Sequence, residues 1–553
     1  MSVLGKKWHI VNSSEKSSFE KLLENRGLDL TQELEEFHDP FLLSDMEKAL
    51  QRIQLAINNQ DRILIFGDYD VDGISATAIL VHTLQKLKAN VSYRLPHRVD
   101  DGYGLSLKFI EEFADKEIKL LITVDCGIAC IKEVELANQH GIDVIVTDHH
   151  TIPAELPAAY AILHPLHLAG YPCGNLTGAG VALKLAQALL QRENAGDSEE
   201  ILDTLLDFAC LGTIADMVPL KGENRLIVRR GLHNLRDTKW LGIQALKQFS
   251  GIEANSVCDT YSVGFQIAPR INAAGRIGDP YLALSLLLEN QDPAKAKQLA
   301  EKLDNLNLAR RNMTEHGIIS VQEKIDPDNL PAIIIEKSAD WHAGVIGLLA
   351  GKLSEKYNRP SIVCQEMEGQ IVGSARSPEY FNIVEAIGAC SEHLISFGGH
   401  AQAAGFSVSK ENFPKFAEKI QVYSEAKVAT LIEEVKPTLR IDCEISQEEL
   451  NRDFAAKITS LQPFGVGNQK PTFLLRDLEI HNPSLVGSDG KHLSFSTFNS
   501  NEKLRVIAFN MGSHAANCRQ GEKIDLVCSF EQKIWQGKEY LELMALDFAL
   551  ASR

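Results

Sequence analysis

The sequence predicts an α/β protein of several unlike domains: a parallel-sheet domain, a long connecting helix, a smaller α/β domain and a C-terminal β-barrel. Three observations predict this. Short apolar runs alternate with amphipathic helical stretches in the first half of the chain. The stretch AKAKQLAEKLDNLNLARRNMTEH then keeps a helical spacing without Pro or Gly. Short runs with period-two alternation fill the last part, and 553 residues are too many for one core.

The composition is that of a soluble globular protein, with 44% hydrophobic and 24% charged residues. No apolar run is long enough to cross a bilayer, and the first residues lack the pattern of a signal peptide, so we expect a cytoplasmic location. The 10 cysteines form no C-x-x-C pair, which favours reduced thiols over zinc sites. The net charge of −18 argues against coating nucleic acid through bulk electrostatics, but it is compatible with a local basic channel.

Changes in the pattern of apolar and polar residues along the chain set the expected domain boundaries. We expect an N-terminal arm over 1–45, a first α/β domain over 46–291, a connecting helix over 292–330, a second α/β domain over 331–434 and a barrel over 435–553. In the first domain the strands RILIF, KLLITV and DVIVT are continuously apolar, as strands are when helices cover both faces of a sheet. The second begins with AIIIE and a helix near Gly344. Five alternating runs after residue 435 fit an OB-type barrel, a fold often used to hold single-stranded nucleic acid.

Acidic and imidazole side chains gather where the apolar runs of the first domain end. They are Asp68, Asp70 and Asp72 after RILIF, Asp125 after KLLITV, Asp148, His149 and His150 after DVIVT, and Asp216 after LLDFACLGTIA. Ligands of open parallel sheets bind beyond the carboxyl ends of the strands, so these groups should share one crevice. One aspartate in such a place is usually a turn residue or helix cap. Four separate segments with the same ending make coincidence the weaker explanation.

This set of side chains suits divalent metal ions. Carboxylates and imidazole without thiolates favour Mn²⁺ or Mg²⁺ over zinc or copper. The candidates exceed what one ion needs, whereas two ions that share a bridging aspartate would use them all. Such a pair holds the attacking and leaving oxygens of an in-line displacement at phosphorus. The chemistry implied is phosphoester hydrolysis.

Several motifs together resemble the DHH phosphoesterase family. GDYDVDG, TVDCG, VTDHH and GTIADMVPL occur in the family's order, and the family is named after the triplet that VTDHH contains. NAAGRIGDP at 272–280, SARS at 374–377 and FGGHAQAAGF at 397–406 add to the match, the last two resembling the DHH-associated domain. The resemblance covers nearly the whole chain, including the barrel. Within the family it points to the exonucleases that degrade single-stranded DNA from 5′ to 3′.

The resemblance implies a role for each member of the acidic cluster. The metal ligands would be Asp68, Asp70, Asp72, Asp125, His149 and Asp216, with Asp125 as the catalytic bridge. His150 would lie beside the scissile phosphate as an electrostatic or acid partner. Smaller family members carry a His four residues before a D-x-D motif. That position is Phe66 here, so Asp68 would supply the missing ligand.

The resemblance also implies residues that hold DNA. Arg276 would anchor a phosphate, because a guanidinium binds phosphate in a bidentate manner. Ser374 and Arg376 would bind a terminal 5′-phosphate, and Gly398, Gly399 and His400 would bring a catalytic imidazole against the nucleotide. Weaker candidates are Arg98 and the pair Arg310 and Arg311. Stacking on DNA could also involve the barrel aromatics Phe495, Phe498, Phe509 and Trp535, although most of these are expected in the barrel core and Trp535 is the best exposed candidate. Without the resemblance, such arginines would be read as solvated surface residues.

The leading hypothesis is a Mn²⁺- or Mg²⁺-dependent exonuclease that releases 5′-mononucleotides from single-stranded DNA in repair and recombination. One alternative is a DHH phosphodiesterase for short oligoribonucleotides or cyclic dinucleotides, although such enzymes usually lack a barrel. Another is a catalytically inactive replication subunit, although those relatives have degenerate ligand positions and this chain has all of them. The family further implies a single-strand-binding protein and a helicase as partners, and we expect a monomer with no membrane association.

Overall fold

The computed structural model describes residues 2–11, 16–28, 34–98, 101–102, 104–168, 170–193, 196–326, 329–431, 438–487, 489–499, 503–535 and 538–551. The chain forms two compact units. One contains residues 34–430 with 465–467, and the other contains residues 1–33, 431–464 and 468–553. The stretch 1–45, which the sequence suggested as a single arm, is therefore divided between the two units.

The larger unit begins with an all-parallel sheet of five strands. In spatial order the strands are β3 (Val91–Arg94), β2 (Ile63–Phe66), β4 (Leu120–Val124), β5 (Asp143–Thr147) and β6 (Ala161–Leu163). The sequence identified β2, β4 and β5 from their apolar runs. It did not identify β3, which is partly exposed, or β6, which has only three residues.

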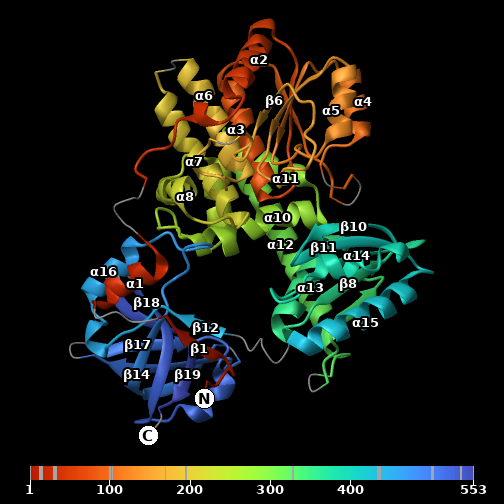
Figure 1. Cartoon of the computed structure of the whole chain (residues 1–553). Helices are drawn as coiled ribbons and strands as arrows, with labels where there is room; N and C mark the ends of the chain where they lie inside the picture. Colours follow the sequence, from red (N-terminus) through yellow and green to blue (C-terminus); the bar gives the residue numbers. More distant parts are fainter. Residues whose placement is uncertain are drawn as a thin grey trace. The chain divides into compact units, whose positions relative to one another are not determined.

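Helices cover both faces of this sheet, as Figure 1 shows. Along β2, Ile63 and Ile65 face a core shared with α2 (Met46–Asn59), α3 (Val71–Lys86), α6 (Gly178–Arg192) and α7 (Ser198–Ala215). The alternate residues Leu64 and Phe66 face a second core with α4 (Leu107–Asp115) and α5 (Ile131–Gln139). Burial on both faces explains why the strands are apolar throughout.

A layer of helices leads from the sheet to the second α/β part. It consists of α8 (Gly222–Asn234), α9 (Leu241–Phe249), the π-helical η4 (Ser262–Ile267), α10 (Ala268–Ile277), α11 (Pro280–Leu288) and α12 (Pro293–Gln322). The 30-residue α12 is the expected long helix, capped by the Asp292 side chain, which accepts hydrogen bonds from two backbone N–H groups. It buries Ala300 in the first core and Val321 against α13 (Ala343–Tyr357), so one helix joins both parts of the unit.

The second α/β part is a five-stranded sheet in the order β10 (Leu394–His400), β11 (Ala403–Ser409), β9 (Gln370–Arg376), β8 (Ser361–Glu366) and β7 (Ile334–Ser338). Only β7 and β8 pair in parallel, and the other neighbours are antiparallel. Val363 of β8 faces α13, whereas Ile362 faces the core that includes α14 (Ile383–Gly388) and α15 (Phe413–Leu431). The α/β prediction for this region is confirmed (Figure 1).

The smaller unit is a seven-stranded mixed sheet. Its order is β13 (Cys443–Glu444), β14 (Phe473–Glu479), β18 (Lys523–Trp535), β19 (Lys538–Leu550), β17 (Lys503–Ala508), β16 (His492–Phe498) and β15 (His481–Val486), with α16 (Arg452–Ser460) beside it. The five runs seen in the sequence correspond to β14 and β16 to β19.

The first residues of the chain belong to this smaller unit. Strand β1 (Lys7–Ile10) pairs in parallel with β12 (Thr438–Ile441). In α1 (Ser18–Arg26), the Arg26 guanidinium donates to both carboxylate oxygens of Asp442, at 3.0 and 2.6 Å. Across both units, none of the helices in the described residues has the length and apolarity needed to span a bilayer.

Candidate metal centre

The predicted ligands converge at the carboxyl edge of the parallel sheet. Their oxygen and nitrogen atoms form three groups, and within each group the atoms lie within 4.8 Å of one another. The groups are Asp68 with Asp70 and Asp125, Asp72 with His149 and Asp216, and Asp125 with His149 and His150. Asp125 and His149 each belong to two groups, and of the two only the carboxylate has two oxygens with which to bridge a pair of ions.

The His149 imidazole lies among three carboxylates. Its Nε2 is 3.0 Å from Asp125 Oδ1 and 3.8 Å from an oxygen of Asp72 and of Asp216. Burial lowers the pKa of His149, so the ring stays neutral near pH 7 and can offer a lone pair. The imidazole is therefore placed where it could share a metal ion with these carboxylates.

Helix N-termini hold two of the carboxylates. The Asp70 side chain caps α3 by accepting from the Asp72 and Gly73 backbone N–H groups at 2.9 and 3.1 Å. Asp72 accepts from the Gly178 and Ala179 N–H groups at the start of α6, at 2.7 and 3.0 Å. Such amides, aligned with the helix dipole, stabilise negative charge. The sequence analysis had not pointed to this role of the TGAG segment at 177–180, which starts α6 and holds Asp72.

Two glycines allow the helices to approach the ligands. A Cβ at Gly178 would come within 2.5 Å of Asp125 Cβ, and a Cβ at Gly212 of α7 would come within 2.3 Å of Asp72 Oδ1. Asp216, which the sequence analysis placed at the same rim after an apolar stretch, is the C-cap of α7. Because α7 packs so closely here, Asp216 still reaches the centre.

Asp148, the first residue of the name-giving triplet, orients its two neighbours. It is 1% exposed and belongs to none of the three ligand groups among the described residues. Its carboxylate accepts from the backbone N–H groups of His149 at 2.7 Å, His150 at 3.1 Å and Ile128 at 2.9 Å. It also lies 2.8 Å from His150 Nδ1. Asp148 thus fixes both the turn and the His150 ring.

The electrostatics of the centre favour a bound cation. Burial, followed by the charge of Asp70, raises the pKa of Asp68 to about 8. Burial also raises the pKa of Asp216 to about 8 and that of Asp125 well above its usual range, with Asp72 adding to both shifts. In the described residues, Asp68 Oδ1 is buried without a hydrogen-bond partner. Carboxylates in this state fit a divalent ion, which would compensate their charge.

His150 has the opposite character. Burial lowers its pKa, but the hydrogen bond and charge of Asp148 outweigh that effect and raise the pKa to about 9. The ring is therefore protonated near pH 7. It can stabilise negative charge on a phosphate or donate a proton.

Four arginines from separate segments lie close to one another in the same unit. Burial, followed by the charges of Arg98, Arg310 and Arg376, lowers the pKa of Arg276 to about 10. Arg98 and Arg310, weaker candidates in the sequence, thus join the two stronger ones, Arg276 and Arg376. A group of like charges in a buried setting suits a bound phosphate, which accepts several charge-assisted hydrogen bonds.

Ser374 and Arg376 lie together on β9. Arg376 Nη1 donates to Ser374 Oγ at 3.2 Å and to the Ala375 carbonyl at 2.8 Å. Gly347 of α13 faces them, since a Cβ there would meet Ser374 Oγ at 3.1 Å. Ser374 and Arg376 therefore form a compact polar site. The residue of α13 that faces this site is a glycine, so no side chain of that residue covers it.

The Gly398, Gly399 and His400 segment lies on the edge strand β10 and is exposed. Through β11, His400 stands in the same cross-strand row as Arg376, and Gly398 stands in the row of Ser374. Residues directly opposite in antiparallel strands share a face. His400 therefore shares a sheet face with the two predicted phosphate ligands, and it is in none of the ligand groups found among the described residues.

Of the phenylalanines expected in the core of the smaller unit, one is buried and two are exposed. Phe495 is 1% exposed, as expected of core, but the same expectation is wrong for Phe498 and Phe509, which are 48% and 50% exposed. Both stand at strand ends, where the sheet no longer covers them. The backbone of Trp535 ends β18, and its side chain lies outside the described residues.

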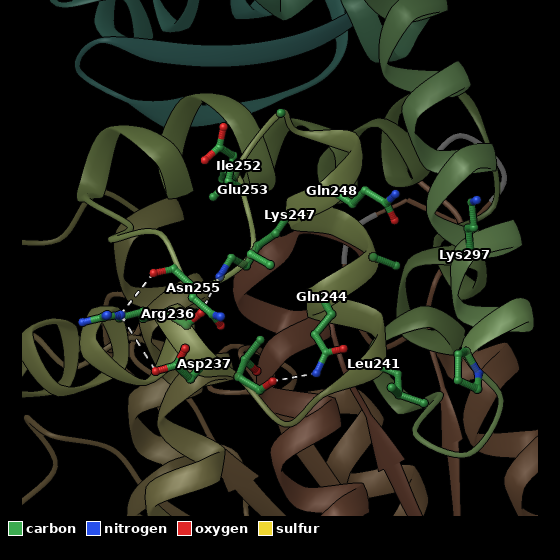
Figure 2. A pocket seen from close by; sticks show the side chains of 15 residues that line it. Arg236, Asp237, Leu241, Gln244, Lys247, Gln248, Ile252, Glu253, Asn255 and Lys297 are labelled. Atoms are coloured by element: carbon green, nitrogen blue, oxygen red, sulfur yellow. Dashed lines mark hydrogen bonds and ion pairs between the residues drawn. The ribbon is translucent and has the colours of Figure 1, made fainter. Parts of the chain in front are cut away.

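A separate pocket lies away from the predicted site residues. Figure 2 shows this cavity of about 870 Å³, lined by residues of α9, the start of α12 and the segments around them. Two of its polar side chains are hydrogen-bonded to the backbone: Lys247 Nζ donates to two carbonyls, and Gln244 Nε2 donates to the Thr238 carbonyl. None of the predicted site residues lines it.

Comparison with known proteins agrees with this domain arrangement. Residues 62–213 match the DHH family N-terminal domain, residues 330–425 match the DHHA1 domain, and residues 441–547 match the RecJ OB domain. The OB-type prediction for the C-terminal region is therefore confirmed.

Comparisons over the whole chain agree with these domain matches. The single-stranded-DNA-specific exonuclease RecJ of Bacillus subtilis is 37% identical over 93% of this chain, which spans 65% of that protein's length. The RecJ of Haemophilus influenzae is 33% identical, covering 93% of this chain and 92% of that protein. The crystal structure of Thermus thermophilus RecJ in complex with Mn²⁺ superposes with a TM-score of 0.84 at 28% identity, over 100% of this chain and 80% of that one. This chain therefore belongs to the RecJ family.

Proposed function

We propose that the chain is a metal-dependent exonuclease that degrades single-stranded DNA from its 5′ end and releases 5′-mononucleotides. The observation that carries the proposal is the convergence of six candidate ligands at one sheet edge. The names of the curated relatives, single-stranded-DNA-specific exonuclease, support the substrate. An inactive replication subunit is a poor fit, because every ligand position is intact and in place.

The metals are Mn²⁺ or Mg²⁺, as in the Thermus thermophilus structures. Asp68, Asp70 and Asp125 would hold one ion. Asp72, His149 and Asp216, together with the shared Asp125, would hold a second. When bound, such a pair supplies hydroxide near neutral pH and neutralises charge on the phosphate.

The protein's own side chains position the DNA around that centre. His150, protonated and oriented by Asp148, would stabilise charge on the scissile phosphate or donate a proton to the leaving oxygen. Arg98, Arg276, Ser374 and Arg376 would bind the terminal 5′-phosphate, which accounts for the 5′ to 3′ polarity. His400 and its glycines, on the face of Ser374 and Arg376, would contact the nucleotide.

The proposal extends to the cellular setting. Family membership supports a role in DNA repair and recombination, with a single-strand-binding protein and a helicase as partners. We further propose a monomer in the cytoplasm. Size-exclusion chromatography with light scattering tests the monomer, and pull-down with each purified partner tests the two associations.

One experiment tests the catalytic proposal. The protein is incubated with end-labelled single-stranded DNA, duplex DNA or short RNA, in Mn²⁺, Mg²⁺ or chelator. Mononucleotides should appear from the 5′ end of single-stranded DNA only, and both chelator and Asp125→Ala should abolish the release. Equal digestion of duplex DNA, or a preference for dinucleotide RNA, would contradict the proposal and favour the oligoribonucleotide phosphodiesterase.

A further inference from the structure

Arg98 differs from the other arginines of the cluster in how it is held. Among the described residues, its guanidinium makes no hydrogen bond and no ion pair. It lies over the ring of Tyr69 instead, with Cζ 5.2 Å from the ring centroid. A cation held by the face of an aromatic ring keeps its N–H donors available for another acceptor.

The other three guanidiniums are fixed by hydrogen bonds. Arg276 Nη1 donates to the Gly344 carbonyl at 3.4 Å, Arg310 Nη2 to Asn307 Oδ1 at 2.9 Å, and Arg376 Nη1 to a backbone carbonyl at 2.8 Å. The charge of Arg98 helps to lower the pKa of both Arg276 and Arg376, so the groups repel one another. The Asp68 carboxylate attracts Arg98, whose charge lowers the pKa of Asp68, but orienting the guanidinium against this repulsion needs a direct contact.

Tyr69 is well placed to provide that contact. It stands between two candidate metal ligands, and its carbonyl packs against α10, where a Cβ at Gly275 would come within 2.5 Å. Within the described residues the Tyr69 hydroxyl makes no hydrogen bond. The ring therefore offers Arg98 a neutral face on a segment that cannot easily move.

We infer that Tyr69 is a positioning residue that holds Arg98 in the arginine cluster and thereby sets the preference for a 5′-phosphate over a 5′-hydroxyl end. The inference rests on the proposed function. Tyr69 lies in the same loop as Asp68 and Asp70, so it connects the arginines that would bind the terminal phosphate to the metal centre. The distance between the terminal-phosphate site and the metal centre is then fixed by one short segment of backbone.

The test compares one single-stranded oligonucleotide with a 5′-phosphate or a 5′-hydroxyl end. The measured quantity is the ratio of kcat/KM for the two ends. Tyr69→Leu should lower this ratio about 2- to 30-fold, the range expected for a lost cation–π contact. Tyr69→Phe keeps the aromatic face and should retain the ratio. If Tyr69→Leu does not fold, Tyr69→Met serves in its place.

Two further measurements separate positioning from a general structural role. In an Arg98→Ala background, which itself lowers the ratio, adding Tyr69→Leu should lower it no further. Binding of the two oligonucleotides in chelator, followed by fluorescence anisotropy, should show the same loss of preference without catalysis. An unaltered ratio in Tyr69→Leu, or an equal fall in the Arg98→Ala background, overturns the inference. A wild-type protein without exonuclease activity would instead contradict the proposed function.

Discussion

Asp68 stands out among the acidic residues because its position is costly without a metal ion. It is 4% exposed, one oxygen lacks a hydrogen-bond partner among the described residues, and burial with the charge of Asp70 raises its pKa to about 8. An aspartate needed only for a turn would have hydrogen-bond partners for both carboxylate oxygens. A bound metal ion would explain the buried position of Asp68, because the ion would occupy the unpaired oxygen and compensate the negative charge.

Asp68→Ala should therefore abolish Mn²⁺ binding at that position, as Asp70→Ala should, without lowering the melting temperature of the metal-free protein. Removing the carboxylate relieves a repulsion while it deletes a ligand. Isothermal titration calorimetry with Mn²⁺ and thermal unfolding in chelator measure the two effects. Asp115→Ala, an exposed change in the same domain, is the control. Unchanged Mn²⁺ binding in Asp68→Ala would reduce the first aspartate to a turn residue.

The same carboxylates predict how stability depends on pH. The folded-state pKa values of Asp68 and Asp216 are raised to about 8, so the metal-free folded protein holds protons that the unfolded chain has released. Its free energy of unfolding should fall as pH rises from about 4, the unfolded pKa, to about 8. Bound metal requires the deprotonated ligands, so the stabilisation by Mn²⁺ should grow over the same range.

Thermal unfolding with and without Mn²⁺ at pH 6, 7 and 8 measures this difference. Taking the difference at each pH removes the contribution of Asp207, whose pKa burial also raises to about 7 but which is not a candidate ligand. A Mn²⁺-induced shift that is constant or shrinks with rising pH would contradict the assignment.

At the scale of elements, the parts of the site that follow apolar strands were predictable and the parts on helices were not. An apolar run that ends in an acid signals a strand end in a parallel sheet, and β2, β4 and β5 all carried that signal. The stretch before Asp216 looked the same, but it is the buried helix α7. Apolar residues all round suit a buried helix as well as a buried strand, so the pattern could not distinguish them.

The arginine cluster was predictable only in part. Arg276 and Arg376 stood in motifs, whereas Arg310 lay on a long helix where its neighbours gave no reason to prefer it. Its membership depends on α12 passing beside α10, a tertiary contact with no local sequence signal. The same holds for Gly178 and Gly212, whose importance comes from the ligands that lie against them.

Gly212→Ala should disturb the metal centre although the residue is not a ligand. The added methyl would come within 2.3 Å of Asp72 Oδ1 and 2.6 Å of Ala179 Cβ, so α7 or the carboxylate must shift. We expect Mn²⁺ affinity to fall about 10- to 100-fold, as for changes in the groups that support metal ligands. Gly264→Ala is the matched control, because its nearest neighbour would be at an ordinary 3.6 Å. Equal Mn²⁺ affinity in both variants would show that the contact can relax without cost.

At the scale of the whole molecule, the smaller unit is built from both ends of the described chain. Asp547 of β19 is fully buried, and its carboxylate accepts from the Ser2 hydroxyl, the Leu4 backbone N–H at 3.3 Å and Trp8 Nε1 at 2.8 Å. No pattern near residue 8 predicts a partner more than 400 positions away. This is why the sequence suggested an independent arm.

Asp547→Ala should loosen the first strand specifically. Leaving these donors unpaired costs about 1–3 kcal/mol, which corresponds to roughly a 5- to 150-fold faster local opening. Hydrogen exchange of the β1 and β12 amides measures that opening, with the amides of β2 and β4 in the other unit as internal control. Asp547→Asn, which keeps one acceptor oxygen, should give an intermediate rate. Exchange in β1 that does not change would show that the strand is held by its pairing alone.

The parallel pairing of β1 with β12 has a consequence for the order of events during synthesis. Residues 7–10 leave the ribosome before the larger unit, but their partners at 438–441 and most of the smaller unit follow only after residues 34–430 have emerged. Because domains generally fold as they appear, the larger unit can fold while residues 7–10 are still unpaired. An unpaired strand of this kind can be bound by chaperones or can pair with a wrong partner. The candidate metal centre can therefore be assembled on a nascent chain before the smaller unit exists.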